Sequence, residues 1–255
     1  MPFDIVSKLD NRIRRPWRVR RLRRRLHADN TELIRLGTEH GGWTLPARVF
    51  ESKGTAICVG AGEDISFDVE LNKQGFTVYT VDPTPRAKEH VTKVLEAAAG
   101  GPPVAINHSA DEVYDLRGFD AERFTFVEMG VWNENAPMRF FGPKDPRHVS
   151  HSIVNLQRTD HWFEANCATL GSICESHKIG QIDVLKLDVE GAEYTILENI
   201  LENGPLPKVV CMEFDEIRNP IDSALMKRIM GTMDRLVTAG YRFRHLENSN
   251  TLLVR

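Results

Sequence analysis

Residues 55–82, TAICVGAGEDISFDVELNKQGFTVYTVD, contain the pattern that decides the fold. The apolar run 55–60 predicts a buried strand, the segment 64–75 a helix that ends at a glycine, and the run 76–82 a second strand. A strand, a helix and a strand within about thirty residues form a βαβ unit, whose strands pair in parallel through a right-handed crossover. The stretch therefore predicts an α/β fold with helices on both faces of a parallel sheet.

The rest of the chain repeats this alternation of apolar runs and helix-like segments. The predicted helices span 86–98, 168–180, 194–204 and 223–240, and the predicted strands span 123–132, 138–141, 182–188 and 208–216, with a terminal hairpin at 241–246 and 250–255. We therefore expect an α/β fold with a single doubly wound, mostly parallel sheet that ends in an antiparallel hairpin. A polar lead-in at 39–50 and a long connection that includes 147–163 carry no predicted strand.

The first thirty residues differ in charge from the rest of the chain. They carry ten basic residues against three aspartates, a net charge of +7, so that −10 falls on residues 31–255 of a chain whose total is −3. Such an asymmetry indicates a basic arm appended to an acidic body. We therefore divide the chain into a partly helical arm at 1–30 and one domain at 31–255.

Apolar residues recur every four or five positions within residues 12–26 of this arm, namely Ile13, Trp17, Leu22 and Leu26. A helix with this stripe between arginine flanks suits an anionic membrane surface. Pro16 interrupts that helix, and an arm that folds back on the acidic body is an equal alternative. Nucleic acid would also attract the arginines, but we do not expect it as a partner.

The cysteines and the apolar runs indicate the cellular compartment in which the protein is expected. The four cysteines show neither a disulfide framework nor a metal-ligand spacing, which predicts reduced, buried thiols. No apolar run reaches the roughly 18 residues that cross a bilayer, and no apolar segment follows the N-terminal arginines as it does in a secretory signal. We expect a cytoplasmic protein, with the arm as a candidate contact to the inner face of a membrane.

The first predicted strand ends in a glycine-rich turn. Ligands of open α/β sheets bind at the carboxyl ends of the strands, near the point where the strand order reverses. Gly60, Ala61 and Gly62 bring backbone N–H groups to that end without bulky side chains. Asp82 ends the second strand twenty residues after Gly62, where a carboxylate can accept hydrogen bonds from both hydroxyls of a ribose. Together they indicate a site for an adenosine-containing cofactor.

Two acidic residues in this turn discriminate between the cofactors that fit such a site. A dinucleotide site needs a third glycine where its pyrophosphate meets the helix, but this chain has Glu63 and Asp64 there. Carboxylates repel a pyrophosphate and attract the ammonium group of a methionine moiety. Charge therefore favours S-adenosylmethionine (SAM) over NAD, and an NAD-dependent oxidoreductase is the alternative.

A second group of charges lies in LKLDVEGAE, residues 185–193, at the end of a core strand. Asp188 could take part in chemistry there together with Glu190, or it could simply N-cap the following helix. Lys186 shares a strand face with Asp188 and would be costly to bury without a carboxylate partner. We expect Asp188 and Glu190 to form a wall of the site with Lys186 as their partner, and Glu193 to stabilise the helix end.

The segments VGAGEDISFDVEL (59–71), VYTVDPTPRA (78–87) and IDVLKLDVEGAEYTILENIL (182–201) resemble the FkbM-type family of SAM-dependent methyltransferases. The likeness covers roughly residues 54–214, and KLDVEGAE is its most specific part. The resemblance implies a Rossmann-like class I methyltransferase fold and O-methylation of hydroxyls on sugars, glycans or natural products. The chain departs from the common class I pattern at Cys58 and Val59, where an acidic residue is usual, and at Asp64, which replaces a third glycine.

Methyl transfer to a hydroxyl needs a group that accepts the hydroxyl proton as the oxygen attacks the methyl carbon. Asp188 and Glu190 are candidates for this catalytic role. His151 is the preferred histidine, because the resembling family often carries a serine-rich segment at this place. His148 and His161 in the same connection are further candidates, and a surface position without a role is the alternative for each histidine.

Carboxylates of Asp188, Glu190 and Glu213 raise the question of a hard divalent metal, whereas no His/Cys spacing supports zinc. The sequence does not decide whether a metal binds or which oligomeric state the protein adopts. Our hypothesis is a SAM-dependent O-methyltransferase for a hydroxylated, carbohydrate-like acceptor. Its expected cofactor-binding residues are Gly60, Ala61, Gly62, Glu63, Asp64 and Asp82. A non-catalytic adaptor at a membrane, built on the same fold, is the second alternative.

Overall fold

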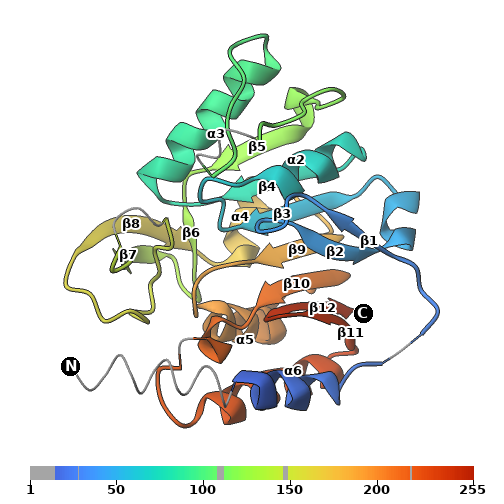
Figure 1. Ribbon diagram of the computed structural model, residues 1–255, viewed down its shortest axis with the longest axis vertical. Coiled ribbons are helices and arrows are strands. Elements are labelled where there is room, and N and C mark those ends of the chain that lie inside the picture. The colour runs from blue at the N-terminus through green and yellow to red at the C-terminus, as the bar shows by residue number, and fades with distance from the viewer. Residues whose placement is uncertain (1–14, 28, 108–111, 146–148, 219) are drawn as a thin grey trace.

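A seven-stranded sheet forms the centre of the computed structural model, which describes residues 15–27, 29–107, 112–145, 149–218 and 220–255 (Figure 1). Its strand order is β11 (Arg242–Glu247), β12 (Asn250–Val254), β10 (Val209–Glu213), β9 (Val184–Leu187), β3 (Thr55–Val59), β4 (Thr77–Val81) and β5 (Phe124–Val127). The strands from β10 to β5 pair in parallel, while β12 pairs antiparallel with both β10 and β11. The predicted doubly wound sheet with its terminal hairpin is confirmed.

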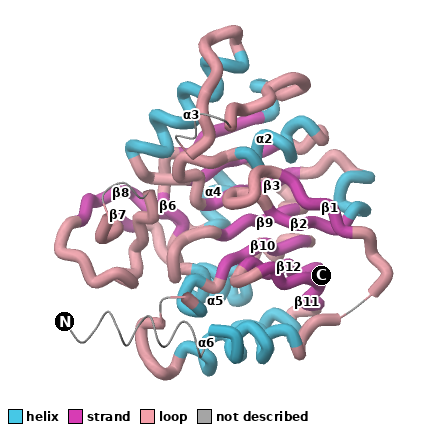
Figure 2. Tube along the Cα trace, in the orientation of Figure 1, coloured by secondary structure: helices cyan, strands magenta, loops and turns pink. Residues whose placement is uncertain are grey.

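Helices cover both faces of this sheet (Figure 2). The helices α2 (Ser66–Lys73) and α3 (Pro85–Ala98) pack on one face, and α4 (Leu170–Ser176), α5 (Glu193–Asn203) and α6 (Leu225–Thr238) pack on the other. Side chains alternate along the central strand, because Ile57 and Val59 point to the α5 side and Ala56 and Cys58 to the α2 side. Burial on both faces explains why these strands read as unbroken apolar runs.

The strand order reverses beside β3. The chain runs outward from β3 through β4 to β5, and it then returns to place β9 on the other side of β3. The carboxyl ends of β3, β4 and β9 therefore lie together, at the position where open α/β sheets bind their ligands.

A three-stranded sheet beside the main one corrects the prediction for residues 123–132. That run divides into β5 and β6 (Gly130–Val131), and β6 belongs to a separate sheet in the order β6, β8 (Trp162–Ala168), β7 (Ala136–Phe141). Met129 N donates to Val127 O in the tight turn that ends β5. The strand β8 lies in the connection for which no strand was expected. Its first five side chains alternate between exposed and half-buried positions, and only Cys167 and Ala168 at its end are buried, so no apolar run marks it in the sequence.

The lead-in also contains structure that the sequence pattern did not indicate. There β1 (Leu33–Leu36) and β2 (Trp43–Pro46) form an antiparallel pair, and the 3-10 helix η1 (Ala47–Glu51) follows it. Trp43 and Leu45 are buried in the same core as α2, so the hairpin covers that face of the sheet. Two further 3-10 helices, η2 (Ala121–Arg123) and η3 (Asp215–Ile217), precede β5 and follow β10.

Residues 15–23 form a helix that lies beside α6 (Figure 1). Leu22 is fully buried in the core on the α6 side, and Arg18 Nη1 donates a hydrogen bond to Ile217 O over 3.1 Å. Trp17, by contrast, is 54 % exposed. This part of the predicted arm therefore packs against the body of the protein. The domain division at residue 30 stays a prediction.

Three features bear on the surroundings of the protein. The contact of residues 12–26 with a membrane stays a prediction, and residues 12–14 lie outside the described part of the chain. Across the described residues, every helix is too short or too polar to traverse a bilayer. All four cysteines are unpaired and buried, and burial raises the pKa of each thiol, so the prediction of reduced, buried cysteines is confirmed.

Candidate active site

One open cavity lies at the carboxyl ends of β3, β4 and β9. The predicted cofactor-binding residues and the preferred catalytic candidates line it, namely Gly60, Ala61, Gly62, Glu63, Asp64, Asp82, His151, Asp188 and Glu190. Its empty space, which includes solvent at its mouth, is ≈ 980 Å³. The fold thus brings together residues that are far apart in the sequence, while the role of each residue stays a prediction.

Gly60 follows β3 in a conformation that disfavours any side chain. Its φ is +86°, and a Cβ atom at this position would collide with the carbonyl oxygen of Asp188. Gly62 also has a positive φ, +52°, and a Cβ atom there would lie 3.1 Å from Val149 Cγ2. The two glycines therefore keep the turn narrow and leave its backbone open to the cavity.

Asp82 supports the glycine turn from the neighbouring strand. Its Oδ2 accepts hydrogen bonds from Ala61 N at 2.8 Å and from Gly62 N at 3.2 Å. Its Oδ1 accepts from Thr84 N at 2.7 Å and from Thr84 Oγ1 at 2.6 Å. The sequence predicts that Asp82 binds ribose hydroxyls, but both of its oxygens already have protein donors, so a ligand would share them.

Glu63 has a basic partner that the sequence argument did not consider. Its carboxylate accepts from Arg86 Nε at 3.2 Å and from Arg86 Nη2 at 2.7 Å. The side chain of Glu63 is only 12 % exposed, so this ion pair is partly shielded from water. Part of the negative charge invoked above in favour of SAM over NAD is therefore offset inside the protein.

Asp64 connects the turn to two other segments. Its Oδ2 accepts from Thr38 Oγ1 at 2.6 Å and from Asn107 Nδ2 at 3.1 Å, and its Oδ1 accepts from Ser66 N at 3.0 Å. Thr38 lies between β1 and β2, so the hairpin is fixed to the glycine turn. Asp64 therefore stabilises the rim of the cavity, in addition to its predicted contact with the cofactor.

Lys186 ties β9 to the glycine turn. Its side chain is 4 % exposed, Nζ donates a hydrogen bond to Gly60 O, and Nζ lies 3.6 Å from Asp188 Oδ2. Burial alone would lower the pKa of Lys186, but the carboxylates of Asp188 and Asp68 outweigh it, and the pKa is raised. The expected contact between Lys186 and Asp188 is confirmed.

Asp68 of α2 makes the stability of this region depend on pH. Burial raises the pKa of Asp68 from 3.8 to about 6, against the hydrogen bond from Thr80 Oγ1 at 2.5 Å, which lowers it. Because the folded state holds this proton more tightly, the free energy of unfolding falls as the pH rises from about 4 to about 6, by about 3 kcal/mol for this group. We expect Asp68→Asn to lack this contribution in urea denaturation across that range. Parallel pH profiles of the variant and the wild type would contradict the assignment.

Asp188 does not cap the following helix. The helix α5 begins at Glu193, its N-cap is Ala192, and no side chain accepts a capping hydrogen bond there. The cap alternative for Asp188 is therefore wrong, because the turn 189–192 separates it from the helix. Asp188 instead has a side chain that is 34 % exposed and lines the cavity. Glu193 Oε1 accepts from Val189 N at 3.2 Å, so Glu193 supports this turn.

Glu190 lies in the same turn with an uncommon backbone conformation. Its φ is 54°, in the left-handed region, and Ser152 Oγ donates a hydrogen bond to its carbonyl oxygen over 2.7 Å. Burial raises the pKa of Glu190 to about 7, although a hydrogen bond from Ser150 lowers it. The turn is thereby tied to the segment that carries His151.

His151 is the histidine that the fold places at the cavity. Its Nδ1 lies 3.0 Å from Val149 O, and its ring makes an edge contact with Phe163 at 5.4 Å between centroids. Because a carbonyl can only accept, Nδ1 carries the proton in the neutral ring and Nε2 keeps a lone pair. His161 does not line the cavity; its Nε2 lies 3.1 Å from Pro143 O. His148 lies outside the described residues.

Sequence reasoning missed several residues that line the cavity. His40 and Gly41 come from the β1–β2 hairpin, Val131 and Phe140 from the second sheet, and Asn107 from a loop. The alternation of Trp43 and Leu45 was the available signal for the hairpin. Asn107 carried no signal, because its position depends on hydrogen bonds of its own N–H and side chain to residues of the glycine turn.

Solved structures that are similar to this chain share little sequence with it. A TDP-rhamnose 3′-O-methyltransferase of calicheamicin biosynthesis is 13% identical over 81% of this chain and 74% of that chain, with a TM-score of 0.42. A TehB-like SAM-dependent methyltransferase from Corynebacterium glutamicum is 11% identical over 82% and 86%, with a TM-score of 0.35. The cofactor-bound protein Rv0187 from MTB is 10% identical over 100% and 97%, with a TM-score of 0.43. No curated protein matches the chain.

A family comparison identifies the chain more directly. The methyltransferase FkbM domain matches residues 55–243, from the start of β3 into β11, and it includes the glycine turn and the turn after β9. The resemblance found in the sequence is confirmed, and the NAD-dependent alternative is set aside. The chain therefore belongs to the FkbM family of methyltransferases, and SAM is the cofactor expected of that family.

Proposed function

We propose that the protein transfers the methyl group of SAM to a hydroxyl oxygen of a carbohydrate, glycan or natural-product acceptor. Membership of the FkbM family supports methyl transfer, and one observation supports a hydroxyl acceptor. His151 lines the same cavity as the glycine turn, and its Nε2 is the ring nitrogen that can accept a proton. Methylation of a hydroxyl needs such a group, because the oxygen loses its proton as it attacks.

The cavity has the features that a SAM site requires. A Cβ atom is excluded at Gly60, so the backbone of the turn can approach a ligand closely. Apolar side chains from the neighbouring strands, Val59 and Val81, line the cavity and offer a surface for an adenine ring. The residues that would hold the cofactor are Gly60, Ala61, Gly62, Glu63, Asp64 and Asp82. Bound SAM supplies a methyl carbon made electrophilic by the positive sulfur.

In the proposed reaction, His151 and Asp188 act on the acceptor side of the cavity. The acceptor oxygen forms a bond to the methyl carbon while the bond from that carbon to sulfur breaks, and the hydroxyl proton passes to His151 Nε2. The imidazolium that results is favoured by the negative charge of Asp188 in the cavity wall. The bond from Nδ1 to Val149 O fixes the ring orientation before the proton arrives.

His151→Asn is expected to lower kcat by about 10²- to 10⁴-fold and to leave the Kd for SAM within about twofold, because only the proton acceptor is removed. The assay follows transfer of a labelled methyl group from SAM to a panel of hydroxylated glycosides and extracts. His161→Asn is the matched control, since His161 belongs to the same connection but does not line the cavity. Equal kcat values for wild type and His151→Asn would remove His151 from this role. SAM binding without transfer to any acceptor would favour the adaptor alternative.

A further inference from the structure

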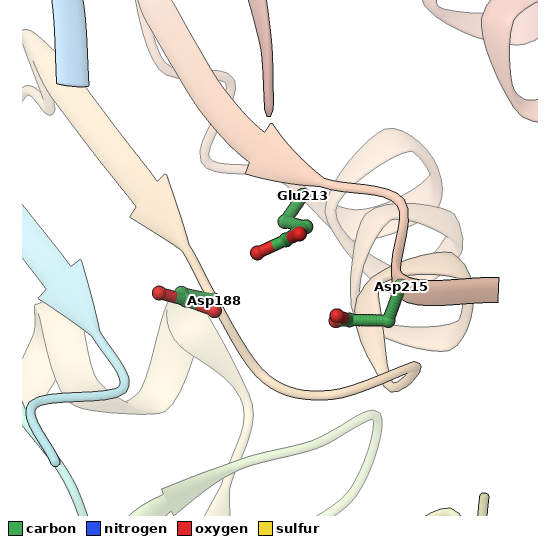
Figure 3. Close-up of side chains that lie close together, drawn as sticks. All are labelled: Asp188, Glu213 and Asp215. Atoms are coloured by element: carbon green, nitrogen blue, oxygen red, sulfur yellow. The ribbon is translucent and has the colours of Figure 1, made fainter. Parts of the chain in front are cut away.

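Three carboxylates from two neighbouring strand ends converge beside the cavity (Figure 3). Asp188 follows β9, Glu213 is the last residue of β10, and Asp215 begins η3. One carboxylate oxygen from each lies within 4.8 Å of the other two. The parallel pairing of Leu187 with Met212 explains this arrangement, because it sets the next residues of both strands side by side.

Asp215 is the member of this cluster that the protein does not satisfy. The residue is 6 % exposed, and its Oδ2 has no hydrogen-bond partner in the described part of the chain. In Figure 3 its carboxylate points toward Asp188 and Glu213. A buried carboxylate without a donor or a cation is costly, because it has lost its hydration and gained nothing in return. Native proteins keep such a group where a ligand or a proton completes its surroundings.

The basic side chains nearby are assigned to the other two carboxylates. Lys186 Nζ lies 3.6 Å from Asp188 Oδ2, and Arg218 Nη2 lies 3.3 Å from Glu213 Oε1. Ser249 Oγ also donates to Glu213 Oε1 over 2.6 Å. Within the described residues, no arginine or lysine forms an ion pair with Asp215, so no basic side chain offsets the charge of Asp215 when it is ionised.

We propose that Asp188, Glu213 and Asp215 bind a hard divalent cation. The donor set consists of oxygen alone, which suits Mg²⁺, Mn²⁺ or Ca²⁺ and does not suit zinc. Ligand oxygens on opposite sides of Ca²⁺ lie about 4.8 Å apart, so oxygens within 4.8 Å of one another fit one Ca²⁺ coordination shell. Opposite oxygens on Mg²⁺ lie about 4.2 Å apart, so that ion would draw the carboxylates closer together. The sequence raised Glu190 as a metal ligand, and the structure replaces it with Asp215 in the cluster.

A cation at this place would act on the cavity through Asp188, which belongs to both the carboxylate cluster and the cavity wall. It would neutralise the carboxylates of β9 and β10 and fix the orientation of the Asp188 side chain at the cavity wall. The proposal concerns binding of the ion alone. Its test uses neither SAM nor an acceptor, so its failure would leave the proposed methyl transfer unaffected.

The full chain, freed of metal with a chelator, is titrated with Mn²⁺ while the free ion is followed by electron paramagnetic resonance. We expect saturable binding of one Mn²⁺ per chain, competition by Ca²⁺ or Mg²⁺, and a higher thermal midpoint in the presence of each ion. Wild-type protein that shows no saturable Mn²⁺ binding overturns the proposal.

Asp215→Asn separates a metal site from a structural role. The amide keeps the shape of the side chain, so we expect Mn²⁺ affinity to fall at least about tenfold while the metal-free variant melts at or above the wild-type midpoint. Glu216→Gln is the matched control, because Glu216 is in the same 3-10 helix but its carboxylate pairs with Arg228 at 2.8 Å. Glu213→Gln serves as a second ligand variant. Wild-type affinity in both Asp215→Asn and Glu213→Gln would exclude this site.

Discussion

Lys186→Met is expected to lower the free energy of unfolding by about 1–3 kcal/mol, because it leaves the carbonyl oxygen of Gly60 without its buried donor and removes the cation that faces the partly exposed Asp188. Methionine keeps the volume of the side chain, but it has no ammonium group to donate a hydrogen bond to Gly60 O or to pair with Asp188. The side chain of Lys186 is 4 % exposed, so water cannot replace the lost ammonium without opening the strand end. Urea denaturation at neutral pH, analysed by linear extrapolation, measures the change.

Lys208→Met is the control that separates the loss of any paired lysine from the loss of a buried one. Lys208 Nζ lies 2.6 Å from Asp183 Oδ1, a shorter contact than that of Lys186, but its side chain is 59 % exposed. An exposed pair contributes roughly 0–1 kcal/mol, so burial and not distance sets the difference between the two variants. Similar unfolding midpoints for the two variants would show that Lys186 is not the anchor that its burial implies.

The main sheet could be predicted because burial on both faces leaves a strong trace in the sequence. The runs that became β3, β4, β9 and β10 are nearly unbroken apolar segments, and glycines end the helices between them. The strand β8 leaves no such trace, since Glu164 and Asn166 face solvent and alternate with half-buried residues. A strand of this kind is recognised through its partners β6 and β7, which are far from it in the chain.

In the candidate site, too, the sequence predicted some features and missed others. Gly60, Asp82 and Asp188 were found because each follows a core strand, and the carboxyl ends of parallel strands share one edge of the sheet. What these residues contact could not be inferred, because Asp82 bonds to the glycine turn and Glu63 pairs with a residue of α3. The cluster partner Asp215 was missed for a related reason, since its position depends on the 3-10 helix after β10.

Gly60→Ala is expected to reduce kcat/KM for methyl transfer by about 100-fold or more, because a displaced cofactor turn misplaces the reacting atoms. At a φ of +86° the new methyl group would meet the carbonyl oxygen of Asp188, which is backbone and cannot swing aside. Either the glycine turn or the strand end of β9 must move, and both line the cavity. Calorimetric titration with SAM and the labelled-methyl assay measure the two consequences.

Gly118→Ala distinguishes this collision from the conformational penalty shared by both positions. Gly118 has a φ of +82°, close to that of Gly60, but a Cβ atom there would meet nothing within 4 Å. Both substitutions place a side chain in the left-handed region, at a cost of about 1–3 kcal/mol in stability. Only Gly60→Ala should also weaken SAM binding, because only its methyl group pushes on a wall of the cavity. If both variants bound SAM as the wild type does, the close approach of Gly60 to Asp188 would have no role in holding the cofactor.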